Sequence, residues 1–331
     1  MTTAYKECLL VQGARQIGKT FIIEKFGKDN YTNYIYLNFY KNPEYKEIFE
    51  GSLEPVEIYK KISLYVNDVH FVSGSTLIFL DEIQDCPNAR TALKFLAIDD
   101  QYDVISSGSL LGLHYKEMAS IPVGYERTIE MYSLDFEEFL WAVGKTPEAI
   151  AVLREYFDKK VKVENGIHEQ FISLLREYLA IGGMPEAVNV STPQFPLVAY
   201  EKPDQFKVYV TDIGLLTSLY GFETQAALLK DTLTGPAKGG IYENLVFDML
   251  IKRGFSLNYF KNDKNTQEIE FLFAKDGCVI PVEVKSKNGT TVSLNNFIKH
   301  YAPPYAYKLV SGNLGVSDTK ITLPLYMTMF L

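Results

Sequence analysis

A glycine-rich segment near the start of the chain has the residue types and spacing of a phosphate-binding loop. Residues Gly13–Thr20 read GARQIGKT, which fits the pattern G-x4-G-K-[ST]. In such a loop the glycines let backbone N–H groups turn inward around phosphate oxygens, the lysine reaches the β- and γ-phosphates, and the threonine hydroxyl binds magnesium. The alternative is a glycine-rich turn with an exposed lysine. The segment predicts a site for ATP and Mg2+, with contacts from Gly13, Ala14, Arg15, Gln16, Ile17, Gly18, Lys19, Thr20 and Phe21.

Two acidic residues at the end of a second strand pattern are placed to complete this site. The apolar run Leu77–Leu80 leads directly into Asp81 and Glu82. We expect Asp81 to lie beside the phosphate loop and support the magnesium ion, and Glu82 to polarise a water for attack on the γ-phosphate. The next strand pattern ends at Ser107 and Ser109, where a hydroxyl can act as a sensor of that water or of the γ-phosphate. Ordinary strand-end acids and a Ser-Gly turn are the alternatives.

A second group of charged residues lies in the C-terminal part of the chain. Glu243 falls in a helix pattern, Glu270 in a strand pattern, and Glu283 and Lys285 at the end of the next strand pattern. Because side chains alternate along a strand, Glu283 and Lys285 point to the same side. The carboxylates suit a magnesium ion, and the lysine can orient a water or stabilise a pentacovalent phosphate. The alternative is an exposed strand with cross-strand ion pairs, which contribute little stability.

The elements that must position these residues follow from hydrophobic spacing. Over the first ~140 residues short apolar runs alternate with helical periodicity, which is typical of a parallel sheet covered by helices. A helical segment and a second α/β pattern follow. The strands are expected at 8–12, 34–39, 76–81, 104–107, 128–134, 257–260, 269–273, 279–285 and 306–310. The helices are expected at 19–26, 55–69, 88–96, 135–143, within 146–188 with a break at 164–166, at 241–253 and at 293–301.

Composition and charge exclude several classes of protein. The chain has 331 residues and a net charge of -8, with 47% apolar and 22% charged residues, which argues against disorder. No apolar run approaches the ~18 residues of a membrane helix, and the first residues do not form a secretory signal pattern. Three scattered cysteines indicate neither a disulfide framework nor a metal site, so we expect a cytoplasmic protein without membrane contact. Residues 1–235 carry a net charge of -11, whereas residues 236–331 carry +3.

Several motifs along the chain resemble one known family. They are GARQIGKT, LIFLDEIQ (77–84), VISSGSLLG (104–112), YSLDFEEFLWA (132–142), GGMPEAV (182–188), PLVAY (196–200), FKVYVTDIGLL (206–216), IYENLVFDML (241–250) and PVEVKSK (281–287). Together they resemble the AAA-type ATPases of bacteria and archaea that carry a C-terminal domain long labelled as of unknown function. The acid on one strand followed by E-x-K on the next is similar to the pattern of the PD-(D/E)xK nuclease superfamily.

The resemblance implies a P-loop NTPase fold with an additional strand between the strands that carry the two nucleotide motifs (Walker A and Walker B). By the same resemblance Lys19 and Thr20 bind phosphate and magnesium, Asp81 supports magnesium, and Glu82 is the general base. Relatives often have Gly-Arg where this chain has Gly124-Tyr125, and Arg127 follows two residues later. They also have a long helical segment between GGMPEAV and PLVAY, which is short in this chain.

These observations predict an α/β protein in four parts. Residues 1–143 form the P-loop ATPase domain, 144–188 a small helical lid, 189–205 a shortened linker, and 206–331 an α/β domain of restriction-endonuclease-like type. The function expected is magnesium-dependent ATP hydrolysis that moves the C-terminal domain, which acts on DNA or on a protein partner, alone or as a homo-oligomer. Two alternatives remain open. One is a nucleotide-switched binding module with little turnover and an inactive nuclease-like domain, and the other is an ATP-gated nuclease.

Overall fold

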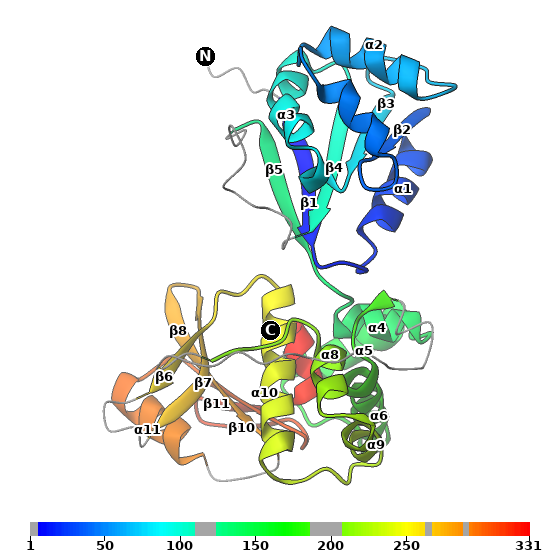
Figure 1. The fold of residues 1–331 in the computed structure, drawn as a ribbon. Coiled ribbons are helices and arrows are strands. Elements are labelled where there is room, and N and C mark those ends of the chain that lie inside the picture. Colours follow the sequence, from blue (N-terminus) through cyan, green and yellow to red (C-terminus); the bar gives the residue numbers. More distant parts are fainter. Residues whose placement is uncertain (1–5, 110–123, 186–206, 262–266, 287–290) are drawn as a thin grey trace. The chain divides into compact units, whose positions relative to one another are not determined.

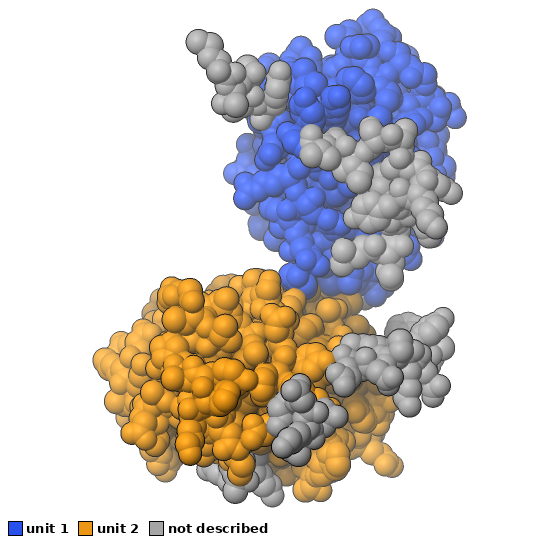
Figure 2. Space-filling model, turned by 90° about the vertical axis from the view of Figure 1, so that its left-hand side faces the viewer, with its two compact units in different colours: residues 1–132 blue, residues 133–331 orange. Residues whose placement is uncertain are grey.

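The computed structural model of the chain describes residues 6–109, 124–185, 207–261, 267–286 and 291–331. The chain divides into two units, residues 1–132 and residues 133–331, which Figure 1 shows as ribbons and Figure 2 in blue and orange. Each unit has its own sheet and its own hydrophobic core.

A five-stranded parallel sheet forms the centre of the first unit. Its order is β2-β3-β4-β1-β5, so β4 lies between β1, which leads into the phosphate loop, and β3, which ends in the acids. This confirms the additional strand that the family resemblance implied. The register places Gly13 beside Ser109 on one side and beside Met131 on the other. The strands are β1 (Cys8–Gly13), β2 (Asn33–Asn38), β3 (Thr76–Asp81), β4 (Asp103–Ser109) and β5 (Glu126–Met131).

Helices cover both faces of this sheet. Helix α1 (Lys19–Asn30) packs on one face through Ile23, which joins a cluster with Phe79 of β3. Helices α2 (Pro55–Tyr65) and α3 (Pro87–Asp99) cover the other face and its larger core (Figure 1). All six residues of β3 are buried, as expected for a central parallel strand covered on both sides. Two short 3-10 turns, η1 (Pro43–Phe49) and η2 (Ile83–Asp85), complete the described elements of this unit.

The second unit begins with helices that share one core with its sheet. Phe171 of α6 packs on Tyr326 near the end of the chain, with ring centroids 5.7 Å apart, and His168 Nδ1 lies 2.9 Å from the Tyr326 hydroxyl. The segment expected as a separate lid therefore lies in the same unit and core as the C-terminal sheet. The helices are α4 (Phe136–Ala142), α5 (Pro147–Lys159), α6 (Asn165–Ile181), α8 (Ile213–Leu219) and α9 (Phe222–Leu229).

A mixed six-stranded sheet lies in the second unit. Its order is β10-β11-β9-β8-β7-β6, in which β8, β9 and β11 are parallel and the other pairs are antiparallel. Helix α10 (Gly235–Lys252) packs on one face and α11 (Val292–Tyr301) on the other. The remaining elements are β6 (Asn258–Lys261), β7 (Glu268–Lys275), β8 (Cys278–Lys285), β9 (Ala306–Val310), β10 (Gly315–Ser317), β11 (Lys320–Pro324) and η4 (Leu325–Phe330).

Some elements differ from the expectation. Helix α4 starts at the predicted place, where Asp135 and Glu138 form a capping box, but it lies in the second unit because the division falls after residue 132. Hydrophobic spacing did not indicate α8, α9, β10, β11 or η4. Tertiary hydrogen bonds hold α8 and α9. They run from Thr217 Oγ1 to the Leu179 carbonyl (2.8 Å) and from Gln225 Nε2 to the Ala180 carbonyl (2.9 Å).

The expected linker at 189–205 lies outside the described residues. Among the helices that are described, none is long and apolar enough to cross a membrane.

A buried ion pair anchors the first residues of the second unit. Lys252 and Asp248, both on α10, form an ion pair of 2.8 Å with side chains only 3% and 1% exposed. Lys252 Nζ also donates to Ser133 Oγ (3.0 Å) and to the Leu134 carbonyl (3.2 Å). Burial raises the pKa of Asp248 from 3.8 to about 7, although Lys252 opposes this. Because the folded state holds this proton more tightly, the contribution of Asp248 to stability falls as pH rises from about 4 to about 7.

Motif residues from three segments meet at the same place. Asp212 Oδ2 accepts hydrogen bonds from Ser133 Oγ and from the Gly183 amide, both at 2.8 Å. Leu134 and Gly183 are also joined by a backbone hydrogen bond of 2.7 Å. A Cβ at position 183 would lie 2.0 Å from the Leu134 carbonyl oxygen, so only glycine fits there. These contacts give a structural role to the motifs YSLDFEEF, GGMP and TDIG.

Asp248→Asn should destabilise the second unit, because it leaves the Lys252 ammonium buried without a counter-charge. At pH 8, where Asp248 is ionised because its pKa is about 7, the expected loss in the free energy of unfolding, measured by urea denaturation, is about 3–5 kcal/mol. The double variant Asp248→Asn/Lys252→Met removes both charges and should regain a large part of that loss. Lys159→Met, which breaks an exposed pair with Glu155, should cost less than about 0.5 kcal/mol. A double variant as unstable as the sum of its two single variants would contradict the coupling.

Candidate functional site

The phosphate loop has the backbone conformation of an anion-binding turn. Gln16 and Gly18 both have positive φ angles, 63° and 93°, and Gly18 directly precedes α1. When residues in the left-handed backbone conformation alternate with residues in the right-handed one, successive backbone N–H groups point into one concavity. The first backbone N–H groups of α1 also have no hydrogen-bond acceptor within the helix. The glycine at position 13 is also required, because a Cβ there would lie 2.2 Å from the Met131 carbonyl oxygen. The loop is therefore held between its own strand and the end of β5.

Lys19 folds back over the loop that contains it. The residue is only 8% exposed, and its Nζ donates to the carbonyl oxygens of Gly13 (3.1 Å) and Ala14 (2.5 Å). Burial lowers the pKa of this ammonium, while the negative charges of Glu82 and Asp81 oppose the shift. The cation thus lies over the concavity of the loop, with the two acids of β3 close enough to affect its titration.

Asp81 is the centre of a hydrogen-bond cluster that joins three elements. Its Oδ2 accepts from Thr20 Oγ1 of α1 (3.1 Å), and from Tyr36 OH (2.8 Å) and Asn38 Nδ2 (2.9 Å) of β2. Its Oδ1 accepts from the Ser107 hydroxyl of β4. The residue is 2% exposed. The predicted neighbours Thr20, Asp81 and Ser107 therefore lie together, with the carboxylate fixed from both adjacent strands.

Two residues of this cluster were not predicted from the sequence. Tyr36 and Asn38 are separated by one residue on β2, so they point to the same side of the sheet. Asn38 lies directly opposite Asp81 in the β2–β3 register, and its Oδ1 accepts from the amides of Tyr40 and Lys41. The polar side chain at the end of an otherwise apolar strand was the available signal, but strand pairing is needed to connect it to Asp81.

Glu82 follows Asp81 in a left-handed conformation, with φ 54°. Its backbone amide donates to Asp81 Oδ1 (3.1 Å), and its Oε2 accepts from Gln84 Nε2 (2.5 Å). Gln84 was not among the predicted site residues, although it belongs to the same motif. The bond from Gln84 holds the Glu82 carboxylate in place.

The other predicted loop and sensor residues lie near the cluster or at its edge. Ser109 is buried at the end of β4 beside Gly13, and Ile17 is buried against the position of Gly13. Arg15 is exposed, and Phe21 is 71% exposed on α1.

The residues present fit a magnesium–nucleotide complex. Magnesium in nucleotide sites is held by one or two protein oxygens together with substrate phosphates, and here the Thr20 hydroxyl and the Asp81 carboxylate supply such oxygens. Across the described ranges there is no group of three or more His, Cys, Asp and Glu side chains that could hold a metal ion without a substrate. The donor set therefore suits a metal that arrives with a triphosphate.

The second predicted constellation is partly assembled on β7 and β8. Lys285 Nζ lies 3.0 Å from Glu270 Oε1 and 3.3 Å from Glu283 Oε1. Burial raises the pKa of both carboxyls, against the attraction of Lys285. Burial would lower the pKa of Lys285, but its bonds to the two acids outweigh burial and raise it. Glu283 is 1% exposed and its Oε2 has no hydrogen-bond partner.

Glu243 has different partners. Its Oε1 accepts from Lys207 Nζ (2.8 Å) and from Tyr209 OH (2.6 Å), and Lys207 also pairs with Glu268 of β7 (2.5 Å). Lys207 and Tyr209 were not predicted, because they precede α8 in a segment without periodicity. Glu243 is close enough to Glu270 to help raise the pKa of that carboxyl, but it belongs to a separate ion-pair group.

The comparisons with known families agree with the two-part organisation. Residues 5–140 match the family model described as "AAA domain", and residues 238–327 match the one described as "Domain of unknown function (DUF4143)". The chain is therefore similar to an AAA domain in its first part and to that second family in its last part, as the motifs indicated. No curated protein matches the chain.

Two of the solved structures that match the chain are only distantly similar to it. PCH-2 of C. elegans is 13% identical over 55% of this chain and 52% of that chain, with a TM-score of 0.30. The ORC1 protein of Aeropyrum pernix, solved in complex with DNA, is 14% identical over 44% of this chain and 47% of that chain, with a TM-score of 0.26. This chain therefore covers about half the length of each, and at these TM-scores neither bears on its function.

Tyr36→Phe tests the support of Asp81 from β2. The change removes one donor to Oδ2 and keeps the ring, so the carboxylate is held less firmly. The Kd for magnesium-ATP should rise about fivefold, because one such hydrogen bond contributes about 1 kcal/mol, while ATP binding in EDTA should not change.

The matched control is Tyr31→Phe, which removes a 2.7 Å hydrogen bond to Asp103, a carboxylate at the opposite end of β4. This variant should bind magnesium-ATP like the wild type. An equal rise in Kd for both variants would show a general loss of stability rather than a role for Tyr36.

Proposed function

We propose that the first unit binds magnesium-ATP and hydrolyses it. The observation that carries the proposal is the hydrogen bond between Thr20 Oγ1 and Asp81 Oδ2, which joins the phosphate loop to the acidic strand end. It brings together two motifs separated by 61 positions in the chain. The match of residues 5–140 to the AAA domain supports the same activity.

Each residue of the site has a role that follows from its chemistry. The amides at the start of α1 and the helix dipole bind phosphate oxygens, and Lys19 exchanges its loop carbonyls for the β- and γ-phosphates. Thr20 and Asp81 would hold magnesium, which neutralises phosphate charge when it is bound. Glu82 orients a water and takes its proton as the oxygen attacks the γ-phosphorus, while the bond from that phosphorus to the β–γ bridging oxygen breaks and ADP leaves. Gln84 keeps the Glu82 carboxylate in place.

Lys19→Ala and Glu82→Gln should separate binding from hydrolysis. Lys19→Ala removes the cation from the phosphate loop, so ATP binding measured by calorimetry should fall below detection. Glu82→Gln leaves the residues of the phosphate loop unchanged but removes the carboxylate that acts as general base. The variant should therefore bind ATP like the wild type and release phosphate about a hundredfold more slowly.

Lys28→Ala is the control for Lys19→Ala, since Lys28 lies on the same helix in an exposed pair with Glu24. It should bind and hydrolyse ATP normally. Undiminished ATP affinity in Lys19→Ala, or unchanged phosphate release in Glu82→Gln, would overturn the assignment. Wild-type protein that binds ATP but releases phosphate no faster than a reaction without protein would favour a nucleotide-switched binding module.

We further propose that the nucleotide state is passed to the second unit along the chain itself. Met131 ends β5 beside Gly13 of the phosphate loop, and Ser133 is already fixed by Asp212 and Lys252. Only Tyr132 lies between these two points. Movement of the phosphate loop on hydrolysis therefore acts, through Met131 and Tyr132, on the anchored residue Ser133. The second unit in turn acts on DNA or on a protein partner.

A second candidate function is phosphodiester hydrolysis by the second unit. The specific observation is the buried, unpartnered Oε2 of Glu283 beside Glu270 and Lys285. Two carboxylates suit a magnesium ion shared with a nucleic acid phosphate, and Lys285 can stabilise the charge of the transition state. Glu243 would need to leave Lys207 and Tyr209 in order to join them.

If this site cuts DNA, plasmid should be nicked in the presence of Mg2+ or Mn2+, and Lys285→Ala should reduce the rate at least a hundredfold. Lys230→Ala, an exposed lysine after α9 in the same unit, should cut like the wild type. Persistent nicking in Lys285→Ala would trace the activity to a contaminant or to another site. ATP hydrolysis by the same preparations, measured with and without DNA, shows whether the two units are coupled.

A further inference from the structure

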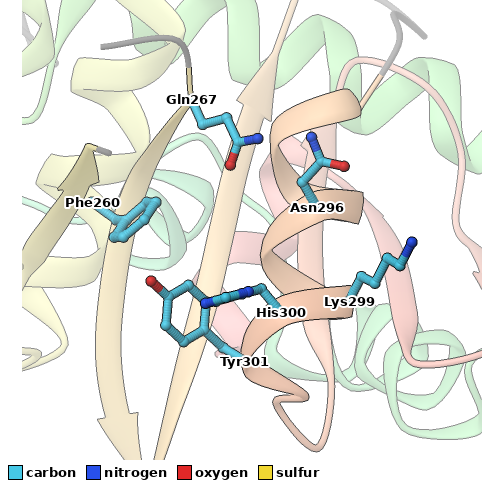
Figure 3. Close-up of a pocket in the computed structure, with 6 residues that line it drawn as sticks. All are labelled: Phe260, Gln267, Asn296, Lys299, His300 and Tyr301. Carbon is cyan, nitrogen blue, oxygen red and sulfur yellow. The ribbon is translucent and has the colours of Figure 1, made fainter. Parts of the chain in front are cut away.

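A pocket of about 390 Å3 lies on the α11 side of the second sheet (Figure 3). Its volume is at the lower end of the range for small-molecule sites, about 300–1,000 Å3. Six residues line it, from the end of β6, the position before β7 and the second half of α11. They are Phe260, Gln267, Asn296, Lys299, His300 and Tyr301.

The floor of the pocket is a set of aromatic rings held by a buried neighbour. Phe260 and Tyr301 meet edge to face, with centroids 5.7 Å apart and planes at 75°. Phe297, which is 6% exposed, packs on both of them at 5.2 and 4.6 Å. His300 lies 4.6 Å from the Tyr301 ring. Tyr301 itself remains 53% exposed, so the pocket offers an aromatic surface whose position is already fixed.

Amide and amino groups lie around these rings. Figure 3 shows the Gln267 and Asn296 amides at the end of the pocket opposite Tyr301, and Lys299 extending outward. An amide presents both a donor and an acceptor, which complements the edge of a nucleobase. None of the six lining residues is acidic. The combination of aromatic rings, amides and a rim cation suits a planar base attached to a phosphate.

The pocket lies near the strand that carries Glu270 of the second ionic cluster. Ile269 and Leu272 of β7 both pack with Phe297 of α11, and Glu270 lies between them in the chain. Gln267 directly precedes β7, at the end of the strand where Glu270 lies. Residues 236–331 also carry a net charge of +3, in contrast to the acidic remainder of the chain.

From these observations we infer that the pocket binds an unpaired nucleobase, which stacks on Tyr301 and Phe260 while its phosphate meets Lys299. The base comes from a single-stranded nucleic acid or from a free nucleotide, and the shared chemistry is recognition of the base. Binding at this place requires neither ATP hydrolysis nor strand cleavage.

The test is fluorescence anisotropy of a labelled single-stranded oligodeoxyadenylate with the full chain, in EDTA and without ATP. Tyr301→Ala should weaken binding about tenfold, because stacking of a base on an aromatic ring is lost. Tyr301→Phe keeps the ring and should bind like the wild type. Tyr220→Ala, which removes a similarly exposed tyrosine from the same unit, should have no effect.

Further probes distinguish the sources of the base. An abasic oligomer of equal charge should bind at least tenfold more weakly than oligodeoxyadenylate. Lys299→Ala should reduce the slope of log affinity against log salt concentration by about one, which corresponds to the loss of one phosphate contact. Competition by AMP at micromolar concentration would identify a free nucleotide as the ligand, whereas competition only by oligomers would identify a strand.

Failure of wild-type protein to bind oligomer or AMP, equal binding of the abasic oligomer, or wild-type affinity in Tyr301→Ala would overturn the inference. EDTA and the absence of ATP prevent hydrolysis and cleavage, and Tyr301 belongs to neither of the other two sites, so these outcomes do not depend on the proposed ATPase or nuclease.

Discussion

The first unit depends on one buried carboxylate that several elements hold in place. Asp81 is a charged side chain that directly follows the apolar run Leu77–Leu80 in a fully buried strand, and burying it without partners would be costly. Thr20, Tyr36, Asn38 and Ser107 supply those partners from α1, β2 and β4. The order β2-β3-β4-β1-β5 brings them together, because β4 and β2 flank β3. The phosphate loop and the acid are thereby fixed relative to each other before any ligand binds.

Local patterns carried most of the information about this unit. The glycines, Lys19 and Thr20 are adjacent in sequence, and their function depends on a turn that the sequence itself specifies. The strands were recognisable because a central parallel strand is apolar throughout. Asn38 and Gln84 could not be identified in this way, because a single polar residue after a strand has many uses. Only the pairing of β2 with β3 shows that Asn38 supports Asp81.

The second unit was harder to predict for a physical reason. Its short helices α8 and α9 are held by tertiary contacts, and the pair Lys252–Asp248 is buried only because Ser133, Leu134 and Tyr178 surround it. These contacts join residues between 38 and 119 positions apart, which no local pattern contains. The proximity of Glu270, Glu283 and Lys285 did follow from strand alternation, whereas the engagement of Glu243 by Lys207 and Tyr209 did not.

The central claim is that the loop and Asp81 form a site for magnesium and a triphosphate. A crystal structure of the chain grown with Mg2+ and a non-hydrolysable ATP analogue tests it most directly. The β- and γ-phosphates should lie against the amides that begin α1, with the metal held by Thr20 Oγ1 and the Asp81 carboxylate at about 2.1 Å. A nucleotide bound elsewhere, or a loop still closed by the Lys19 contacts to Gly13 and Ala14 at saturating analogue, would contradict it.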